Sequence, residues 1–296
     1  MKKKIIKTTF GLLVLIALTA CSGDNGKSDA YGNFEAIDLI VSAQGNGQIL
    51  EFEIMEGQVL HENQEVGLID TSMLHLQKKQ LQSNIKAVAS KMQNVNAQVE
   101  VQQQQLENML IDQKRLKALF RDGAATKKQL DDINGAVDLT RKQITATKTQ
   151  KQNIRDEIDA LYARIEQVNE SIRDCHIINP AQGTVLTKFA EQGEFTATGK
   201  PLYKIANLEV LNLKVYVSGD QLPEVRIGEE VEVLIDKNKS GFTHLKGRIN
   251  WISDQAEFTP KTIQTKKERV NLVYAVKVRV KNDGSLKIGM PGEINF

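Results

Sequence analysis

The chain has 296 residues and a nearly balanced charge, with 39 lysines and arginines against 37 aspartates and glutamates. This balance gives no sign of the concentrated basic face by which proteins bind nucleic acid. Aromatic residues make up only 5% of the chain, and its central third is polar with regular apolar spacing, which indicates helix with a narrow apolar seam. We therefore expect an elongated α+β protein and not one compact globule.

The first 20 residues have the pattern of a targeting segment. Four lysines precede an apolar run at residues 10–17, which is shorter than the roughly 20 residues of a permanent membrane span. The run leads into Leu18-Thr19-Ala20-Cys21, which resembles a bacterial lipobox. We expect residues 1–20 to be a lipoprotein signal peptide, Cys21 to carry the lipid and residues 21–33 to be the anchored linker. The alternative is an ordinary signal peptide that happens to precede a cysteine.

Removal of this segment changes the formal charge and leaves few cysteines. The loss of four lysines and no acidic residue takes the net charge from +2 to −2. With Cys21 lipidated, Cys175 has no cysteine partner, so the exported protein would contain no internal disulfide. No later segment has the composition of a membrane span. We therefore expect an exported polypeptide that is held at a membrane only by its lipid.

Two stretches of the chain share one pattern. Residues 47–70 and 183–206 align at a constant offset of 136. In each, alternating apolar residues lead to a glycine turn and a second short apolar run, which is typical of strand, tight turn, strand. We expect Asn63 to replace Gly199 because Asn also adopts the left-handed conformation. The turn glycines of the two half-motifs are Gly47, Gly57, Gly183 and Gly193.

The two copies resemble the halves of a lipoyl or biotinyl carrier domain. Each half exposes one apolar face, so we expect residues 34–70 and 176–207 to pack together as one lipoyl-like β domain. In a carrier domain, a short hairpin between the halves presents a modifiable lysine. Residues 71–175 take that place here, so a lipoyl or biotinyl carrier protein is only an alternative.

Residues 71–175 have the heptad pattern of a two-helix coiled coil. Apolar residues recur at a and d positions in two series, interrupted at residues 121–126. Gly123 suits a left-handed helix C-cap, and Thr126 with Gln129 suits a capping box. So short a connection makes the helices antiparallel, each about 47 residues and roughly 70 Å long.

The expected seam has two rows of residues in each helix, and its polar members lower stability while helping to fix the register. In the first helix the rows are Leu74, Leu81, Val88, Val95, Gln102, Met109, Leu116 and Ile85, Met92, Val99, Leu106, Gln113, Phe120. In the second helix the rows are Leu130, Val137, Ile144, Lys151, Ile158, Ile165, Ile172 and Ile133, Thr140, Thr147, Ile154, Leu161, Val168.

From residue 208 the apolar period changes to two, which predicts a β barrel over residues 208–296. Apolar residues alternate near residues 211–217, 231–235, 247–251 and 272–280. We expect a single helical turn at residues 220–225 and a long connection at residues 258–271.

The order of these elements resembles that of the HlyD-type membrane fusion proteins, the periplasmic adaptors of tripartite systems in Gram-negative bacteria. The chain is most similar to adaptors of ABC transporters in the stretches Ile178–Val185, Phe258–Val278 and Leu286–Gly292. The resemblance implies a coiled-coil hairpin inserted between the halves of a lipoyl-like domain, followed by a barrel. It also implies a periplasmic homo-oligomer that links an inner-membrane transporter, of ABC type, to a TolC-like outer-membrane channel for efflux or secretion.

The resemblance extends to the hairpin tip. Family members that dock on TolC-like channels have Arg, then Leu four residues on, then Ser seven residues on. This chain has Arg115, Leu119 and Thr126 at that spacing, followed by Ile133, and the threonine keeps the hydroxyl. The resemblance implies that these three residues dock on the channel. They could instead be a solvated arginine, a packing leucine and an N-cap threonine.

No set of residues indicates catalysis. The four histidines, His61, His75, His176 and His244, have no metal-ligand spacing, and no phosphate-binding loop is present. We expect no catalytic residue, metal or cofactor. The alternative to the adaptor that we keep alongside the carrier protein is a passive coiled-coil lipoprotein strut.

Overall fold

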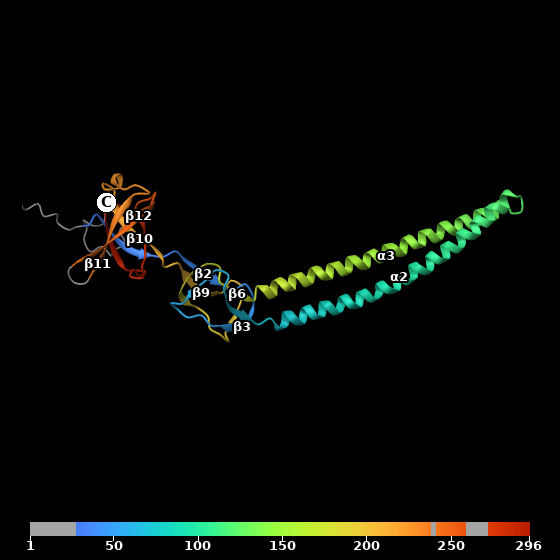
Figure 1. Ribbon diagram of the computed structural model, residues 1–296, viewed down its shortest axis with the longest axis horizontal. Helices are drawn as coiled ribbons and strands as arrows, with labels where there is room; N and C mark the ends of the chain where they lie inside the picture. Colours follow the sequence, from blue (N-terminus) through green and yellow to red (C-terminus); the bar gives the residue numbers. More distant parts are fainter. Residues whose placement is uncertain (1–27, 238–240, 259–271) are drawn as a thin grey trace, which may run out of the picture. The chain divides into compact units, whose positions relative to one another are not determined.

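A computed structural model describes residues 28–237, 241–258 and 272–296 (Figure 1). The chain forms two compact units. The hairpin unit consists of residues 40–181 and 187–204, and the barrel unit consists of the described residues of 1–39, 182–186 and 205–296. We describe each unit by itself.

Two long antiparallel helices dominate the hairpin unit (Figure 1). Helix α2 (Ser72–Arg121) has 50 residues and helix α3 (Lys127–Arg173) has 47. At 1.5 Å per residue they are about 75 and 70 Å long. The sequence-based prediction of a two-helix hairpin is confirmed.

The seam between α2 and α3 changes character along its length. Near the β strands it is apolar, with buried Val88, Val95, Ile154 and Leu161 packed against neighbouring leucine, isoleucine and methionine side chains. Toward the tip polar pairs occur beside the buried Val137 and Ile144: the Gln113 side chain donates to Asn134 Oδ1 at 2.7 Å, and Thr140 Oγ1 lies 3.3 Å from Met109 Sδ. The buried Oε1 of Gln102 has no hydrogen-bond partner among the described residues.

The strands next to the hairpin form two four-stranded sheets. One has the order β2 (Asp38–Ser42), β9 (Pro201–Ala206), β7 (Gly183–Lys188), β4 (Val59–Leu60). The other has the order β6 (His176–Ile178), β5 (Glu65–Ile69), β3 (Gly47–Phe52), β8 (Phe195–Thr196).

The internal repeat is visible in these strands. Strands β3, β4 and β5 begin 136 residues before β7, β8 and β9. Strand β3 pairs with β5 of its own copy and with β8 of the other copy, so each copy completes its sheet with a strand of the second. Asn63 has φ of +61° and its counterpart Gly199 has φ of +86°, which confirms the predicted Asn-for-Gly replacement.

A buried hydrogen-bond network joins the two copies. The Tyr203 hydroxyl donates to Asn179 Oδ1 at 3.1 Å, and the Asn179 side-chain amide donates to the carbonyls of His61 and Ala181, both at 2.7 Å. The Asn63 N–H donates to the Asn179 carbonyl at 2.8 Å. Buried polar groups cost little when they are paired in this way, so Asn179 can fix the two copies in register.

The barrel unit contains seven strands, which form one sheet that closes on itself, and the short 3-10 helix η1 (Leu222–Glu224). Strands β10, β1, β15, β11, β12 and β14 pair in that order, β14 pairs again with β10, and β13 extends from β14. The ring therefore has six strands. The bounds are β1 (Ala30–Glu35), β10 (Val210–Ser218), β11 (Glu230–Asp236), β12 (Phe242–Ile252), β13 (Glu257–Phe258), β14 (Leu272–Lys281) and β15 (Pro291–Asn295).

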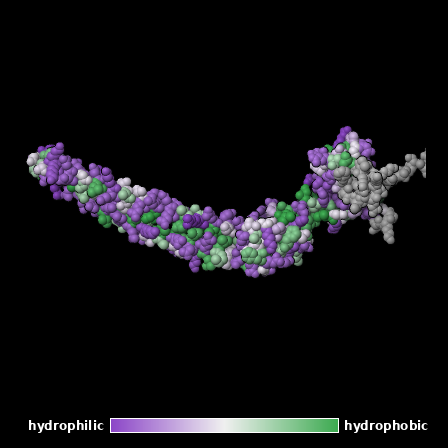
Figure 2. Space-filling view, turned by 180° about the vertical axis from the view of Figure 1, so that it is seen from behind, coloured by the Kyte–Doolittle hydropathy of each residue, from purple (hydrophilic) through white to green (hydrophobic). Residues whose placement is uncertain are grey.

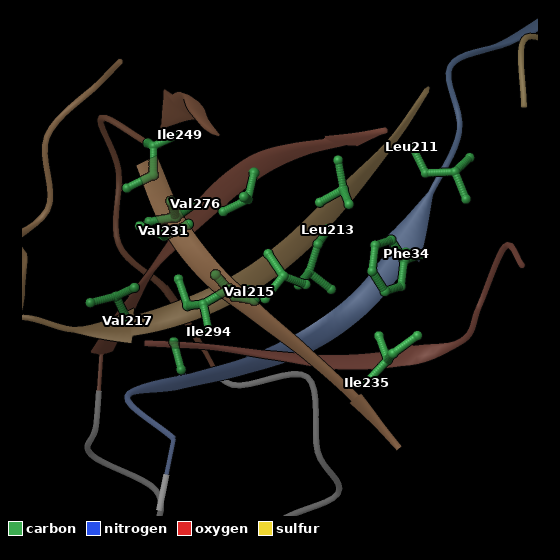
Figure 3. Close-up of a cluster of buried hydrophobic side chains, with 14 of the residues drawn as sticks. Phe34, Leu211, Leu213, Val215, Val217, Val231, Ile235, Ile249, Val276 and Ile294 are labelled. Carbon is green, nitrogen blue, oxygen red and sulfur yellow. The ribbon is translucent and has the colours of Figure 1, made fainter. Parts of the chain in front are cut away.

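The inward side chains of these strands fill the barrel (Figure 3). Phe34, Leu213, Val276 and Ile294 come from four different strands and are all at most 1% exposed. This alternation of buried and exposed residues is the period-two pattern of the sequence, and the predicted β barrel is confirmed. The helical turn expected near residues 220–225 is η1.

Two predicted boundaries are wrong at the N-terminal side. Residues 30–33 were predicted to belong to the linker, and residue 34 to begin the lipoyl-like half. Instead, β1 pairs with β10 and β15 of the barrel. Ala30 and Phe34 are each 1% exposed in the barrel core, and this burial, with two ladders of backbone hydrogen bonds, explains the placement.

Some predictions lie outside the described residues. These are the signal peptide, the lipid site at Cys21, and the connection at residues 258–271 beyond Phe258. Among the helices of the described ranges, none combines the length and the apolar composition that a bilayer crossing requires.

Candidate partner-binding site at the hairpin tip

Helix α2 ends in a tight left-handed turn. Gly123 has φ of +77°, a conformation that costs a residue with a Cβ about 1–2 kcal/mol. The Gly123 N–H donates to the Phe120 carbonyl at 3.1 Å and the Ala124 N–H donates to the Leu119 carbonyl at 2.8 Å. These are the two bonds of a Schellman motif. The predicted C-cap is confirmed, and it turns the chain sharply back toward α3.

Helix α3 begins with a complete capping box. Thr126 Oγ1 accepts from the Gln129 backbone N–H at 3.2 Å, and Gln129 Oε1 accepts from the Thr126 N–H at 2.8 Å. The Thr126 hydroxyl also donates to Gln129 Oε1 at 3.0 Å. The hydroxyl of Thr126 is therefore already engaged, and its structural role as N-cap is present.

The other two predicted docking residues lie on the same face of α2, one turn apart. Arg115 forms an exposed ion pair with Asp112, with 3.5 Å between Nη1 and Oδ1. Exposed pairs of this kind hold a side chain weakly, so Arg115 is available to another acceptor. Leu119 is 42% exposed and does not lie inside the seam. Part of the Leu119 side chain therefore faces solvent.

Phe120 differs from the prediction. It belongs to a seam row of the sequence, but its side chain is 40% exposed. The contacts Gln113–Asn134 and Met109–Thr140 set the antiparallel register, which places Phe120 opposite the first turn of α3. That turn begins with Lys127 and Lys128 and reaches its first apolar residue only at Leu130, so the seam is only partly filled around Phe120.

Most of the hairpin surface is hydrophilic, with hydrophobic residues in separate patches on the face shown in Figure 2. Along α2 the other exposed apolar residues are Met73 and Leu76 near its start, and Val101 and Ile111 further along. Leu119 and Phe120 are adjacent and both exposed. We call these two residues the apolar tip pair. Sequence reasoning missed the exposure of Phe120; the two lysines that begin the second helix were the signal that could have revealed it.

The predicted turn glycines are spread over the β strands and away from the tip. Gly57 and Gly193 have φ of +86° and +90°, in the left-handed region that favours glycine. A Cβ at Gly183 would lie 2.9 Å from the Ala206 carbonyl oxygen, and one at Gly47 would lie 3.0 Å from Ile69 Cγ2. Gly57 and Gly193 therefore serve turns, whereas Gly47 and Gly183 allow close packing of the chain.

The adjacent Cys175 and His176 do not form a catalytic pair. Cys175 is buried, and burial raises the pKa of its thiol. A thiol nucleophile requires a lowered pKa. The His176 ring is partly exposed, and its Nδ1 lies 2.6 Å from Glu65 Oε1. Within the described residues, no group of three His, Cys, Asp or Glu could hold a metal ion.

An open cleft of about 870 Å³ lies at the foot of the hairpin. Its walls come from both copies of the repeat and from both helices, and they include Asp70, Leu74, Cys175 and Phe195. No lysine is among the lining residues.

Comparisons with known proteins agree with this architecture. No protein-family model matches the chain. A "UPF0194 membrane protein" of Yersinia pseudotuberculosis is 26% identical over 291 residues, which cover 90% of this chain and 88% of that protein.

Two solved structures have the same fold. The membrane fusion protein Spr0693 of Streptococcus pneumoniae R6 has a TM-score of 0.58 at 13% identity, with 90% of this chain and 96% of that chain covered. MacA of Actinobacillus actinomycetemcomitans has a TM-score of 0.56 at 18% identity, with 90% and 76% covered. The resemblance to membrane fusion proteins that the sequence indicated is confirmed at the level of the fold.

Proposed function

From the fold of a membrane fusion protein, we propose that the chain is a non-enzymatic periplasmic adaptor. It links an inner-membrane transporter, of ABC type, to a TolC-like outer-membrane channel for efflux or secretion. Copies of the chain assemble side by side as a homo-oligomer. The adaptor supplies reach and contact surfaces, and the transporter supplies the energy.

One observation carries this proposal: the apolar tip pair is exposed at the end of a hairpin about 70 Å long. A coiled coil that only separated two parts would gain nothing by exposing two large apolar side chains at its end. Exposed apolar groups of this kind mark surfaces that bind another protein. Arg115, one turn before Leu119, adds a hydrogen-bond donor on the same face.

We further propose that a lipid on Cys21 holds the chain at the inner membrane, and that the two sheets flanking the hairpin form a lipoyl-like domain. The repeat offset of 136 and the exchange of strands between copies support the second statement. The apolar run at residues 10–17 that leads into Leu18-Thr19-Ala20-Cys21 supports the first.

Site-specific photocrosslinking in the producing bacterium tests the adaptor function. A photoreactive residue replaces Leu119 in the full chain, and the matched control places it at Leu76, which is 60% exposed at the other end of α2. We expect an adduct with the outer-membrane channel from position 119 and none from position 76. If positions 115, 119 and 126 all yield no outer-membrane protein, the chain is a passive strut.

Two mass measurements separate the remaining alternatives. Cleavage before Cys21 with an added diacylglycerol and fatty acyl group is expected for the mature protein, and the Cys21→Ser variant should lack both. A lipoyl or biotinyl adduct on a lysine would instead support the carrier protein. Co-purification with an ABC permease and its ATPase would support the transporter assignment.

A further inference from the structure

Phe120 lies in a heptad row of the seam but is exposed. In the same row Val99, Leu106 and Gln113 are half-buried. Phe120 lies opposite the first turn of α3, where the seam ends. A large aromatic side chain is therefore left 40% exposed beside Leu119, which is 42% exposed.

Charged residues surround this apolar tip pair. Lys117, Arg121, Lys127 and Lys128 all lie within one or two turns of it and are exposed, as are Asp122, Asp131 and Asp132. Arg121 Nε lies 3.6 Å from Asp122 Oδ1, and the Arg121 side chain is 81% exposed. The tip therefore has an apolar centre with a charged rim, in which cations outnumber carboxylates by four to three.

The backbone holds this arrangement in place. The carbonyls of Leu119 and Phe120 are both acceptors in the Schellman motif that ends α2. The capping box fixes the start of α3, where Lys127 and Lys128 follow Thr126 directly. Because both helix ends are capped, the tip pair and the two lysines are presented by rigid backbone, which lowers the entropy cost of binding.

We propose that Phe120 is a second apolar anchor of the tip. With Leu119 it enters an apolar depression of the partner protein, and the surrounding cations face carboxylates on the rim of that depression. Aromatic residues at the centre of an interface with a polar rim are the usual hot spots of binding. This inference rests on the proposed adaptor function, since the partner is the outer-membrane channel.

Binding measurements with the full chain test this role. The probe is the outer-membrane channel identified by crosslinking from position 119, immobilised in detergent. Phe120→Ala is expected to weaken binding by about tenfold or more, and Phe120→Leu, which keeps an apolar side chain, by less. Leu76→Ala, which truncates an apolar side chain that is 60% exposed and remote from the tip, should bind as the wild type does. Circular dichroism and the melting temperature should change little, because Phe120 is not among the buried core residues.

The lysines of the rim have their own test. Lys127→Glu and Lys128→Glu should each weaken binding. Added salt should reduce the affinity of the wild type more than it reduces the affinity of these variants. Mapping of the crosslink from position 120 should find apolar residues with Asp or Glu next to them.

Each negative result contradicts a different part of the proposal. If Leu119→Ala weakens binding but Phe120→Ala does not, Phe120 is no anchor and the adaptor function stands. If positions 115, 119 and 126 all capture no channel, the adaptor function itself fails. Crosslinks from position 120 to a basic or fully polar surface would also overturn the proposal.

Discussion

The unpaired oxygen of Gln102 gives a prediction about hairpin stability. Gln102 lies in the seam, and its buried Oε1 has no hydrogen-bond partner among the described residues. A buried acceptor without a partner costs about 1–3 kcal/mol. Leucine has a similar helix propensity to glutamine and is the apolar residue that this heptad position favours. Gln102→Leu should therefore raise the free energy of local opening by about 1–3 kcal/mol.

Amide hydrogen exchange of the full chain measures this effect locally, which matters because the chain has two compact units. Amides of α2 near residue 102 should exchange roughly tenfold more slowly for each 1.4 kcal/mol gained. Gln103→Leu, at the neighbouring exposed position, is the matched control and should change little. If Gln102→Leu leaves exchange unchanged or makes it faster, the oxygen is already satisfied and our reasoning is wrong.

Three further outcomes follow from the described contacts. Thr126→Ala should destabilise the start of α3 by about 1 kcal/mol and speed exchange at Gln129, whereas Thr126→Ser should not. Gly193→Ala forces a Cβ into φ of +90° and should lower the unfolding free energy by about 1–2 kcal/mol, seen as a lower denaturation midpoint than that of Gly135→Ala, which lies within α3 near its N-terminal end. Burial raises the pKa of Cys175 in the folded state, so this group stabilises the fold below the thiol's ordinary pKa and the contribution is lost as pH rises through the raised value. Iodoacetamide should therefore modify native Cys175 slowly at pH 8, and rapid modification without unfolding would contradict the burial.

The elements that the sequence predicts well are those with local causes. The hairpin follows from heptads, which repeat every two helical turns. Its tip follows from Gly123 and Thr126, which act on their own backbone neighbours. The repeat follows from turn residues whose backbone angles are set locally, as Asn63 and Gly199 show.

The errors lie where the cause is distant in sequence. β1 is short and mostly small or polar, and its place in the barrel depends on β10 and β15, which lie far along the chain. Likewise, the heptad pattern alone assigns Phe120 to the seam. Its exposure depends on the register between two helices and on which residues begin the second one. Neither fact can be read from the residues around Phe120.

The pairing of β1 with β15 has a consequence for how the barrel forms. Ala30 and Ile294 are opposite each other in that ladder, so the ring cannot close until the segment around Ile294 has been synthesised. Until then Phe34 and the apolar residues of β10 have no complete core to enter. A chain that emerges from its N-terminal end must therefore keep the barrel strands from aggregating while the helices, whose contacts are more local, fold first. A chaperone that binds extended apolar strands would act in this interval.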